Sequence, residues 1–182
     1  MDEGQGEVKE SVTAIRAAAP EDLDTMLGLI AMAVEYMKGQ GIRQWSDGYP
    51  NAEVLMADIR RGESYVCQIG GQIVGTAALS LREEPTYRQI FNGRWLTSGP
   101  YGVIHRIAVD DSHKGQGVAA SFVYYIEKMC ISQGIYSVRV DTHEDNASMQ
   151  RMLKKHGFTY CGVIYLASGD ARVAFEKVLG ER

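Results

Sequence analysis

The sequence is short of cysteine and of long apolar runs, and each shortage excludes a class of protein. Its three cysteines, Cys67, Cys130 and Cys161, are odd in number and widely spaced. They therefore make neither a disulfide framework nor a zinc-binding pattern, and we predict no metal site. We expect buried thiols kept reduced in the cytoplasm. No apolar run reaches the ~18 residues that a membrane span requires, so we predict no membrane partner.

An excess of positive charge is also missing. The chain has 19 lysines and arginines against 23 aspartates and glutamates, a formal net charge of −4. This balance argues against a nucleic-acid partner. The polar, acidic start does not resemble a signal peptide, so we expect a disordered lead-in over residues 1–11 and a single domain over residues 12–182. A homodimer remains an open arrangement.

What is present is a regular succession of strand and helix patterns. Residues 64–81 contain two apolar runs around Gly70-Gly71, which predicts a tight antiparallel hairpin. Residues 82–100 show no sustained period and are long for a connection, which favours a functional flap. The remaining periodicities predict strands and helices: strands over 12–18, 101–109, 136–142, 158–167 and 171–179, and helices over 20–37, 51–61, 118–130 and 146–156.

The octapeptide HKGQGVAA, residues 113–120, fits two phosphate-binding patterns. From Gly115 it is G-x-G-x-x-A, as in the turn of a dinucleotide-binding oxidoreductase, with Asp141 placed to hold a ribose. From Lys114 it is K-x-x-G-x-A, close to the pyrophosphate loop of an acyltransferase that uses coenzyme A. Both patterns place an anion at the N-terminus of a helix.

The surrounding sequence favours the acyltransferase pattern. In a dinucleotide-binding turn the first glycine follows the strand almost directly, whereas here the polar residues 110–114 intervene. The pattern also follows an antiparallel hairpin, past the middle of the chain, where a doubly wound parallel sheet is hard to complete.

The element order, the strand VIHRIAV, the turn DDSHKGQGVAA and the segment NASMQRMLKKHGF together resemble the GNAT superfamily of acetyl-CoA-dependent N-acetyltransferases. The resemblance covers about residues 12–179. Gly117 and Ala119 meet the family signature Q/R-x-x-G-x-G/A, with Lys114 in place of glutamine or arginine. It implies an α/β (α+β) fold with a central mixed, mostly antiparallel sheet flanked by helices and a splayed parallel strand pair.

The resemblance also implies where acetyl-CoA, the co-substrate, binds. The pantetheine arm lies between the two splayed strands, and the backbone N–H of Ile107 faces the thioester carbonyl as an oxyanion donor. Asn146 matches an asparagine that helps to hold the cofactor. The expected cofactor-binding residues are Ile107, Ala108, Val109, Lys114, Gly115, Gln116, Gly117, Val118, Ala119, Ala120 and Asn146.

Catalysis requires a group that removes a proton from the attacking amine. His105 is the favoured base, because it alternates with Val103 and Ile107 on one face of the expected strand and an imidazole has an ordinary pKa of ~6.5. In the family a tyrosine often protonates the departing thiolate, but that position here holds Leu153. Tyr165 is a candidate replacement.

The acceptor itself is not specified by the sequence. Trp45, Tyr49 and Trp95 are aromatic residues in irregular segments, where they can wall a pocket or hold a cation, and His143 follows the second splayed strand. The function expected is transfer of an acetyl group by direct attack of a primary amine of a small molecule or peptide. Loss of the family tyrosine leaves a second hypothesis open, an acyl-CoA sensor without turnover.

A ligand test separates these hypotheses from the oxidoreductase. Acetyl-CoA should raise the melting temperature of the protein and NADH should not, because a ligand that binds only the folded state stabilises it. Stabilisation by NADH alone would contradict the acyltransferase prediction.

Overall fold

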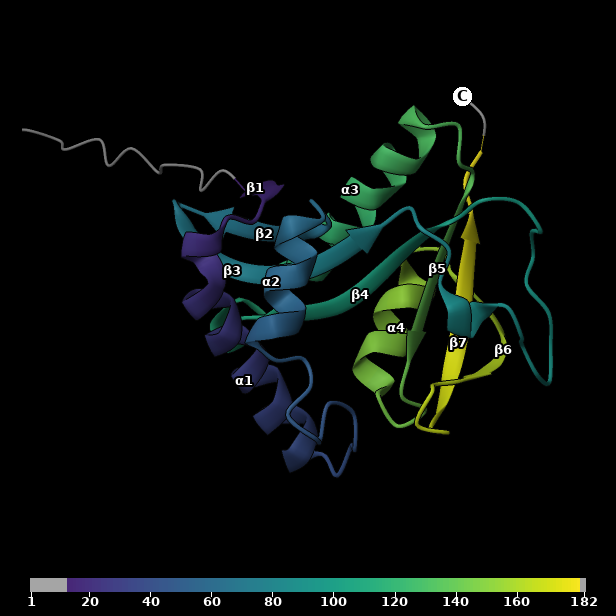
Figure 1. Ribbon diagram of the computed structural model, residues 1–182, viewed down its shortest axis with the longest axis horizontal. Coiled ribbons are helices and arrows are strands. Elements are labelled where there is room, and N and C mark those ends of the chain that lie inside the picture. Colours follow the sequence, from purple (N-terminus) through teal and green to yellow (C-terminus); the bar gives the residue numbers. More distant parts are fainter. Residues whose placement is uncertain (1–12, 181–182) are drawn as a thin grey trace, which may run out of the picture.

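The computed structural model describes residues 13–180 and shows a single twisted sheet between two layers of helices (Figure 1). The sheet has seven strands in the order β1-β2-β3-β4-β5-β7-β6. All neighbours are antiparallel except β4 and β5. The strands are β1 (Thr13–Ala17), β2 (Ser64–Ile69), β3 (Gln72–Ser80), β4 (Gly102–Val109), β5 (Ser137–Thr142), β6 (Thr159–Tyr165) and β7 (Ala171–Val178).

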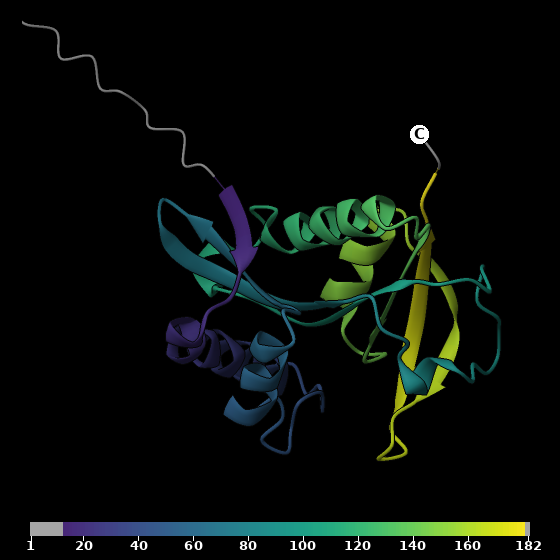
Figure 2. The ribbon, with the colours of Figure 1, turned by 45° about the horizontal axis from the view of Figure 1, so that its top comes forward.

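Four α-helices cover the two faces of the sheet, as Figure 2 shows. The helices α1 (Leu23–Gly39) and α2 (Ala52–Arg60) pack on one face, and α3 (Val118–Ser132) and α4 (Ala147–Lys155) pack on the other. The predicted fold class and element order are confirmed. The first helix begins at Leu23 rather than at Pro20, because residues Pro20–Asp22 form a separate 3-10 turn, η1. No helix within residues 13–180 is long and apolar enough to cross a membrane.

The predicted splayed pair is present between β4 and β5. These parallel strands pair through Gly102 and Val103, which lie opposite Val138 and Arg139. Beyond Val103 the strands diverge, and β5 continues its pairing on the other side with β7 as far as Thr142. The divergence opens a gap in the middle of the sheet.

A β-bulge in β4 changes which side chains face which helices. The register with β3 shifts between Ala78, opposite His105, and Thr76, opposite Ala108, and Arg106 has a left-handed φ of 55°. The extra residue in β4 reverses the face of the sheet toward which the following side chains point. Ile107 therefore packs with the α3 and α4 core, whereas His105 shares the opposite face with Val103. The prediction that His105 and Ile107 lie on one face is wrong.

The segment 81–101, which contains the predicted flap, is fastened to the sheet. It includes a second 3-10 turn, η2 (Pro85–Tyr87). The Trp95 indole donates to the carbonyl of Tyr87 over 2.9 Å, and the backbone N–H of Leu96 donates to Glu176 of β7 over 2.5 Å. Tyr87 is 1% exposed. The segment is thus a fixed cover over β6 and β7.

A buried ion pair lies under this cover. Arg139 and Glu176 are opposite each other in β5 and β7, and the Arg139 Nε lies 3.3 Å from the Glu176 carboxylate. The guanidinium is stacked between the rings of Trp95 and Tyr101. Burial by itself would raise the pKa of Glu176, but hydrogen bonds from Ser137 and Thr97 outweigh it and lower that pKa.

The three cysteines are free and buried, as the sequence predicted. Burial raises the pKa of each thiol, to about 11 at Cys130. A thiolate is the reactive form, so these thiols are protected from modification in the folded protein.

Substituting Glu176→Gln should destabilise the fold by ~3–5 kcal/mol, because it leaves the buried Arg139 charge without its carboxylate. Since the pKa of Glu176 is lowered, the wild-type stabilisation is present above the ordinary glutamate pKa of ~4.3 and is lost as the pH falls below it. Denaturant unfolding at several pH values measures both effects.

The matched control is Glu83→Gln, which removes a carboxylate from the exposed Glu83–Arg88 pair. This variant should leave the free energy of unfolding almost unchanged. Equal effects of the two substitutions would contradict the assigned role of the buried pair.

Candidate active site

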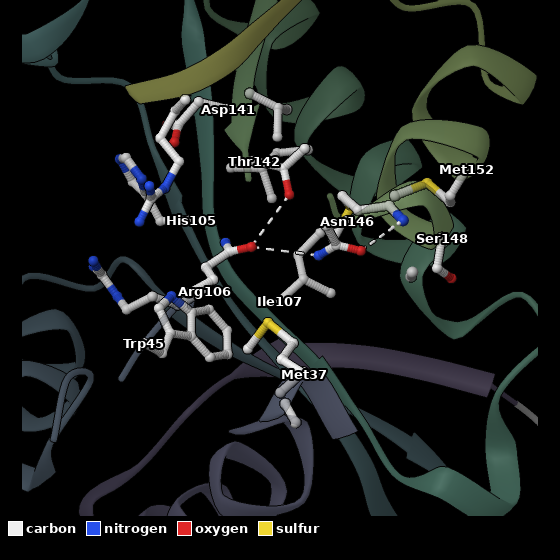
Figure 3. A pocket seen from close by; sticks show the side chains of 18 of the residues that line it. Met37, Trp45, His105, Arg106, Ile107, Asp141, Thr142, Asn146, Ser148 and Met152 are labelled. Carbon is white, nitrogen blue, oxygen red and sulfur yellow. Dashed lines mark hydrogen bonds between the residues drawn. The ribbon is translucent and has the colours of Figure 1, made fainter. Parts of the chain in front are cut away.

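A cleft of about 830 Å³ passes through the gap between β4 and β5. On the α3 and α4 side it is lined by residues 117–120 and by one side of α4. On the opposite side its walls are residues 43–47 of the loop between α1 and α2, Glu84 and Thr86 of the cover, and the turn between β6 and β7. The cleft therefore joins the two faces of the sheet, and Figure 3 shows some of the side chains that line it.

The N-terminus of α3 points unpaired backbone N–H groups at the cleft. Gly117 is the N-cap residue, with a left-handed φ of 83° and no side-chain cap, and Gly115 has a φ of 76°. Both glycines thus adopt a conformation that other residues rarely reach. The N–H groups of residues 118–120 are free for an anion, and the helix dipole adds to the attraction.

Basic side chains surround this end of the cleft. Lys114, Arg151 and Lys155 all line it. The Lys114 ammonium lies 2.5 Å from Asp111 and 3.8 Å from the centre of the Tyr36 ring. Arg151 and Lys155 come from α4 and were not predicted from the sequence, because a helical lysine or arginine usually lies in solvent.

The backbone of β4 offers donors along the gap. The N–H of Asp110 donates to the carbonyl of Val74 in β3 over 2.8 Å, and Ala108 lies opposite Thr76. Polar backbone groups alternate in direction along a strand, so the N–H and C=O groups of Ile107 and Val109 are directed away from β3. They face the gap that the divergence of β5 leaves open.

His105 is paired with a carboxylate that the sequence did not reveal. The imidazole Nε2 lies 3.4 Å from Oε2 of Glu84, and each side chain is about one fifth exposed. The hydrogen bond to His105 is the main cause that lowers the pKa of Glu84 to about 2. Glu84 is therefore ionised at neutral pH and orients the imidazole without itself accepting a proton.

Asp141 lies at the other edge of the gap. Its carboxylate accepts a 2.6 Å hydrogen bond from the Tyr87 hydroxyl, and desolvation raises its pKa against the effect of that bond. Asp141 and His105, both labelled in Figure 3, come from β5 and β4, the two strands that border the gap. The sequence suggested Asp141 only as a ribose ligand of the dinucleotide alternative.

Gln44 bridges the two walls of the cleft. Its side-chain oxygen accepts from the Thr142 hydroxyl, the His143 N–H and the Asn146 amide, each over 3.4 Å. Two of these bonds are dashed in Figure 3. Asn146 also caps α4, since its side chain accepts from the N–H of Met149. Three polar donors thus converge at the end of β5.

The structure brings most of the predicted site residues together, and four are placed elsewhere. His105, Trp45, Tyr49, Asn146 and most of the predicted cofactor-binding residues line the cleft. The four that do not line it are engaged locally: Gln116 donates to the carbonyl of Ser112, Trp95 packs at a tilt against Tyr87, His143 accepts from the N–H of Asp145, and the exposed Tyr165 packs edge-on against Phe91.

Leu153 is fully buried in the core beneath α4. The position at which the family often has a tyrosine is therefore occupied by core packing. Tyr165 is exposed, packs edge-on against Phe91 and is not among the residues that line the cleft, so it supplies no phenol there.

Comparison with known proteins assigns the family. The sequence model of the Acetyltransferase (GNAT) family matches residues 30–158. A GNAT-family acetyltransferase from Streptococcus agalactiae is 33% identical, with 93% of this chain and 96% of that chain covered and a TM-score of 0.84. The chain belongs to the GNAT acetyltransferase family. The predictions of the fold and of an N-acetyltransferase are confirmed, and the oxidoreductase alternative is excluded.

Two further relatives are more distant. The streptothricin acetyltransferase of Escherichia coli is 32% identical over 60 residues, which are 33% of this chain and 34% of that protein. The match thus spans about a third of that relative. The PaiA N-acetyltransferase of Thermoplasma acidophilum, solved in complex with coenzyme A, is 16% identical and covers 92% of this chain and 99% of its own, with a TM-score of 0.71; it supports the fold alone.

Substituting Gly117→Ala should destabilise the protein by ~1–2 kcal/mol, because a residue with a Cβ is strained in the left-handed region. Binding of coenzyme A should weaken as the helix N-terminus shifts. Denaturant unfolding and calorimetric titration measure the two effects.

Gly28→Ala is the matched control. Gly28 lies in α1, and a Cβ there, as at Gly117, meets no atom within 4 Å. Alanine at this helical position should stabilise the protein by up to ~1 kcal/mol and leave coenzyme A binding unchanged. A Gly117→Ala variant as stable as the wild type would contradict the role of the left-handed cap.

Proposed function

We propose that this protein transfers an acetyl group from acetyl-CoA to a primary amine by direct attack within the cleft. The observation that carries the proposal is that the free N-terminus of α3 and the His105 imidazole open into one cleft from opposite faces of the sheet. An anionic donor and an amine acceptor can therefore reach the same gap from two sides.

The residues of the α3 side fit coenzyme A. The N–H groups of residues 118–120, with Lys114, Arg151 and Lys155 around them, suit its phosphate groups. The polar backbone groups of Ile107 and Val109 suit the amides of its pantetheine arm, because an opened strand edge offers free donors and acceptors. Bound acetyl-CoA supplies the acetyl group as a thioester.

The amine must lose a proton to attack. His105 accepts that proton, while the ionised Glu84 holds the imidazole and stabilises its charged form. The N–H of Ile107 stabilises negative charge that develops on the carbonyl oxygen. The amine nitrogen forms the new C–N bond as the C–S bond breaks, and the thiolate leaves.

The thiolate takes its proton from water in this proposal. Leu153 replaces the usual phenol and is buried, and Tyr165 lies outside the residues that line the cleft. An ordinary thiol has a pKa of ~8.5, so the departing thiolate needs little assistance near neutral pH. The absence of the family tyrosine therefore does not favour the sensor hypothesis.

The acceptor side suits an amine on a small molecule or peptide. Trp45 and Tyr49 form its aromatic wall, and Glu84 and Asp141 supply negative charge. The streptothricin acetyltransferase relative acts on a small molecule that its name identifies, which is in line with this class. We also propose a cytoplasmic location, which the buried free thiols favour.

In a thiol-release assay, His105→Ala should lower kcat by ~10²–10⁴-fold, because the attacking amine loses the side chain that accepts its proton. Glu84, with a pKa of about 2, stays ionised near neutral pH and does not replace His105 as the proton acceptor.

The control is His143→Gln, because the His143 ring lies outside the cleft lining. Its kcat should match that of the wild type. An unchanged kcat in His105→Ala would exclude His105 as the base. Absence of thiol release with any amine, despite binding of acetyl-CoA, would favour the sensor hypothesis.

A further inference from the structure

Arg172 is a buried cation on the acceptor side of the cleft that the reaction above does not use. It lies in β7 and is 7% exposed, yet it lines the cleft. Its Nη1 donates to the carbonyl of Ala171 over 2.9 Å. Among residues 13–180, no carboxylate oxygen lies within 4.0 Å of its guanidinium nitrogens. A buried arginine normally has such a partner, since burying a charge without one is costly.

The register of the sheet places Arg172 beside the reacting groups. Asp141 in β5 is directly opposite Ala174 in β7, so Arg172 is its diagonal neighbour on the same face, at a typical spacing of ~7–8 Å. The positive charge of Arg172 acts on Asp141 through space without contact. The same face carries His105 across the gap.

Of the charged groups that line the acceptor side, two sets lie near the reacting groups. Glu84 and Asp141, near His105, suit an ammonium group that approaches the base. Arg172, one diagonal step further along the sheet, presents N–H groups that are not used within the described chain. A guanidinium matches a carboxylate with two parallel hydrogen bonds.

We propose that the acceptor carries a carboxylate near its amine, as an amino acid does, and that Arg172 binds this carboxylate. Arg172 then determines specificity, because it fixes the end of the acceptor opposite to the attacking nitrogen. This inference rests on the acetyl transfer proposed above and adds the chemical class of the acceptor.

The test compares amino acids with their amides, which keep the amine and lose the negative charge. With saturating acetyl-CoA, the wild type should show kcat/KM at least ~10-fold higher for the preferred amino acid than for its amide, as expected for loss of a charge-assisted bidentate pair. Arg172→Gln should bring this ratio close to one, chiefly by raising KM for the acid.

Two variants keep the result interpretable. Arg172→Lys retains the charge without the planar fork and should give an intermediate ratio. Arg60→Gln, at an exposed position of α2, should keep the wild-type ratio. Because each ratio is measured within one variant, partial loss of folded enzyme cancels.

The outcomes distinguish the two proposals. Turnover of amides or carboxylate-free polyamines as fast as amino acids, or an unchanged ratio in Arg172→Gln, would overturn the role of Arg172 and leave acetyl transfer standing. Absence of thiol release with every amine would instead overturn the proposed function, and this inference with it.

Discussion

The divergence of β4 and β5 after Val103 is the constraint on which the site depends. Two parallel strands that stayed paired would close the sheet and satisfy their own backbone groups. Here the separation leaves polar backbone groups of β4 directed into an open gap, next to the free N-terminus of α3. At the bulge in β4 the Arg106 guanidinium lies 2.7 Å from Asp58 of α2, which connects the strand to that helix. The directions of these backbone groups are thus a property of the sheet.

Buried charges fix the parts that the sheet alone does not position. The Arg139–Glu176 pair fastens the cover segment, and this segment delivers Glu84 to His105 and the Tyr87 hydroxyl to Asp141. Burying such charges is costly and often contributes little net stability. In this protein they join segments far apart in the sequence, so their contribution is to the placement of site residues.

The sequence predicted what depends on local patterns. Apolar periodicity located the strands and helices, and the glycines at 115 and 117 located the anion-binding turn. It did not reveal the bulge, because no local pattern marks the positive φ of Arg106, whose side chain contacts Asp58 and Tyr49 far away in the chain. Glu84 lies 21 positions from its partner His105, and Tyr87 lies 54 positions from its partner Asp141. Pairs so far apart in the chain could not be recognised from spacing. Trp95 was expected at the site because a long irregular segment gives no sign of which side chains it buries.

A cleft that opens on both faces of a sheet also has a kinetic consequence. Its lining residues come from the α3 and α4 side and from the side of the α1–α2 loop, so the two substrates can be bound at the same time. Such an architecture suits a sequential mechanism with a ternary complex, in which initial-rate lines intersect, rather than a ping-pong mechanism with parallel lines. The opening between two strands thereby sets the form of the rate law.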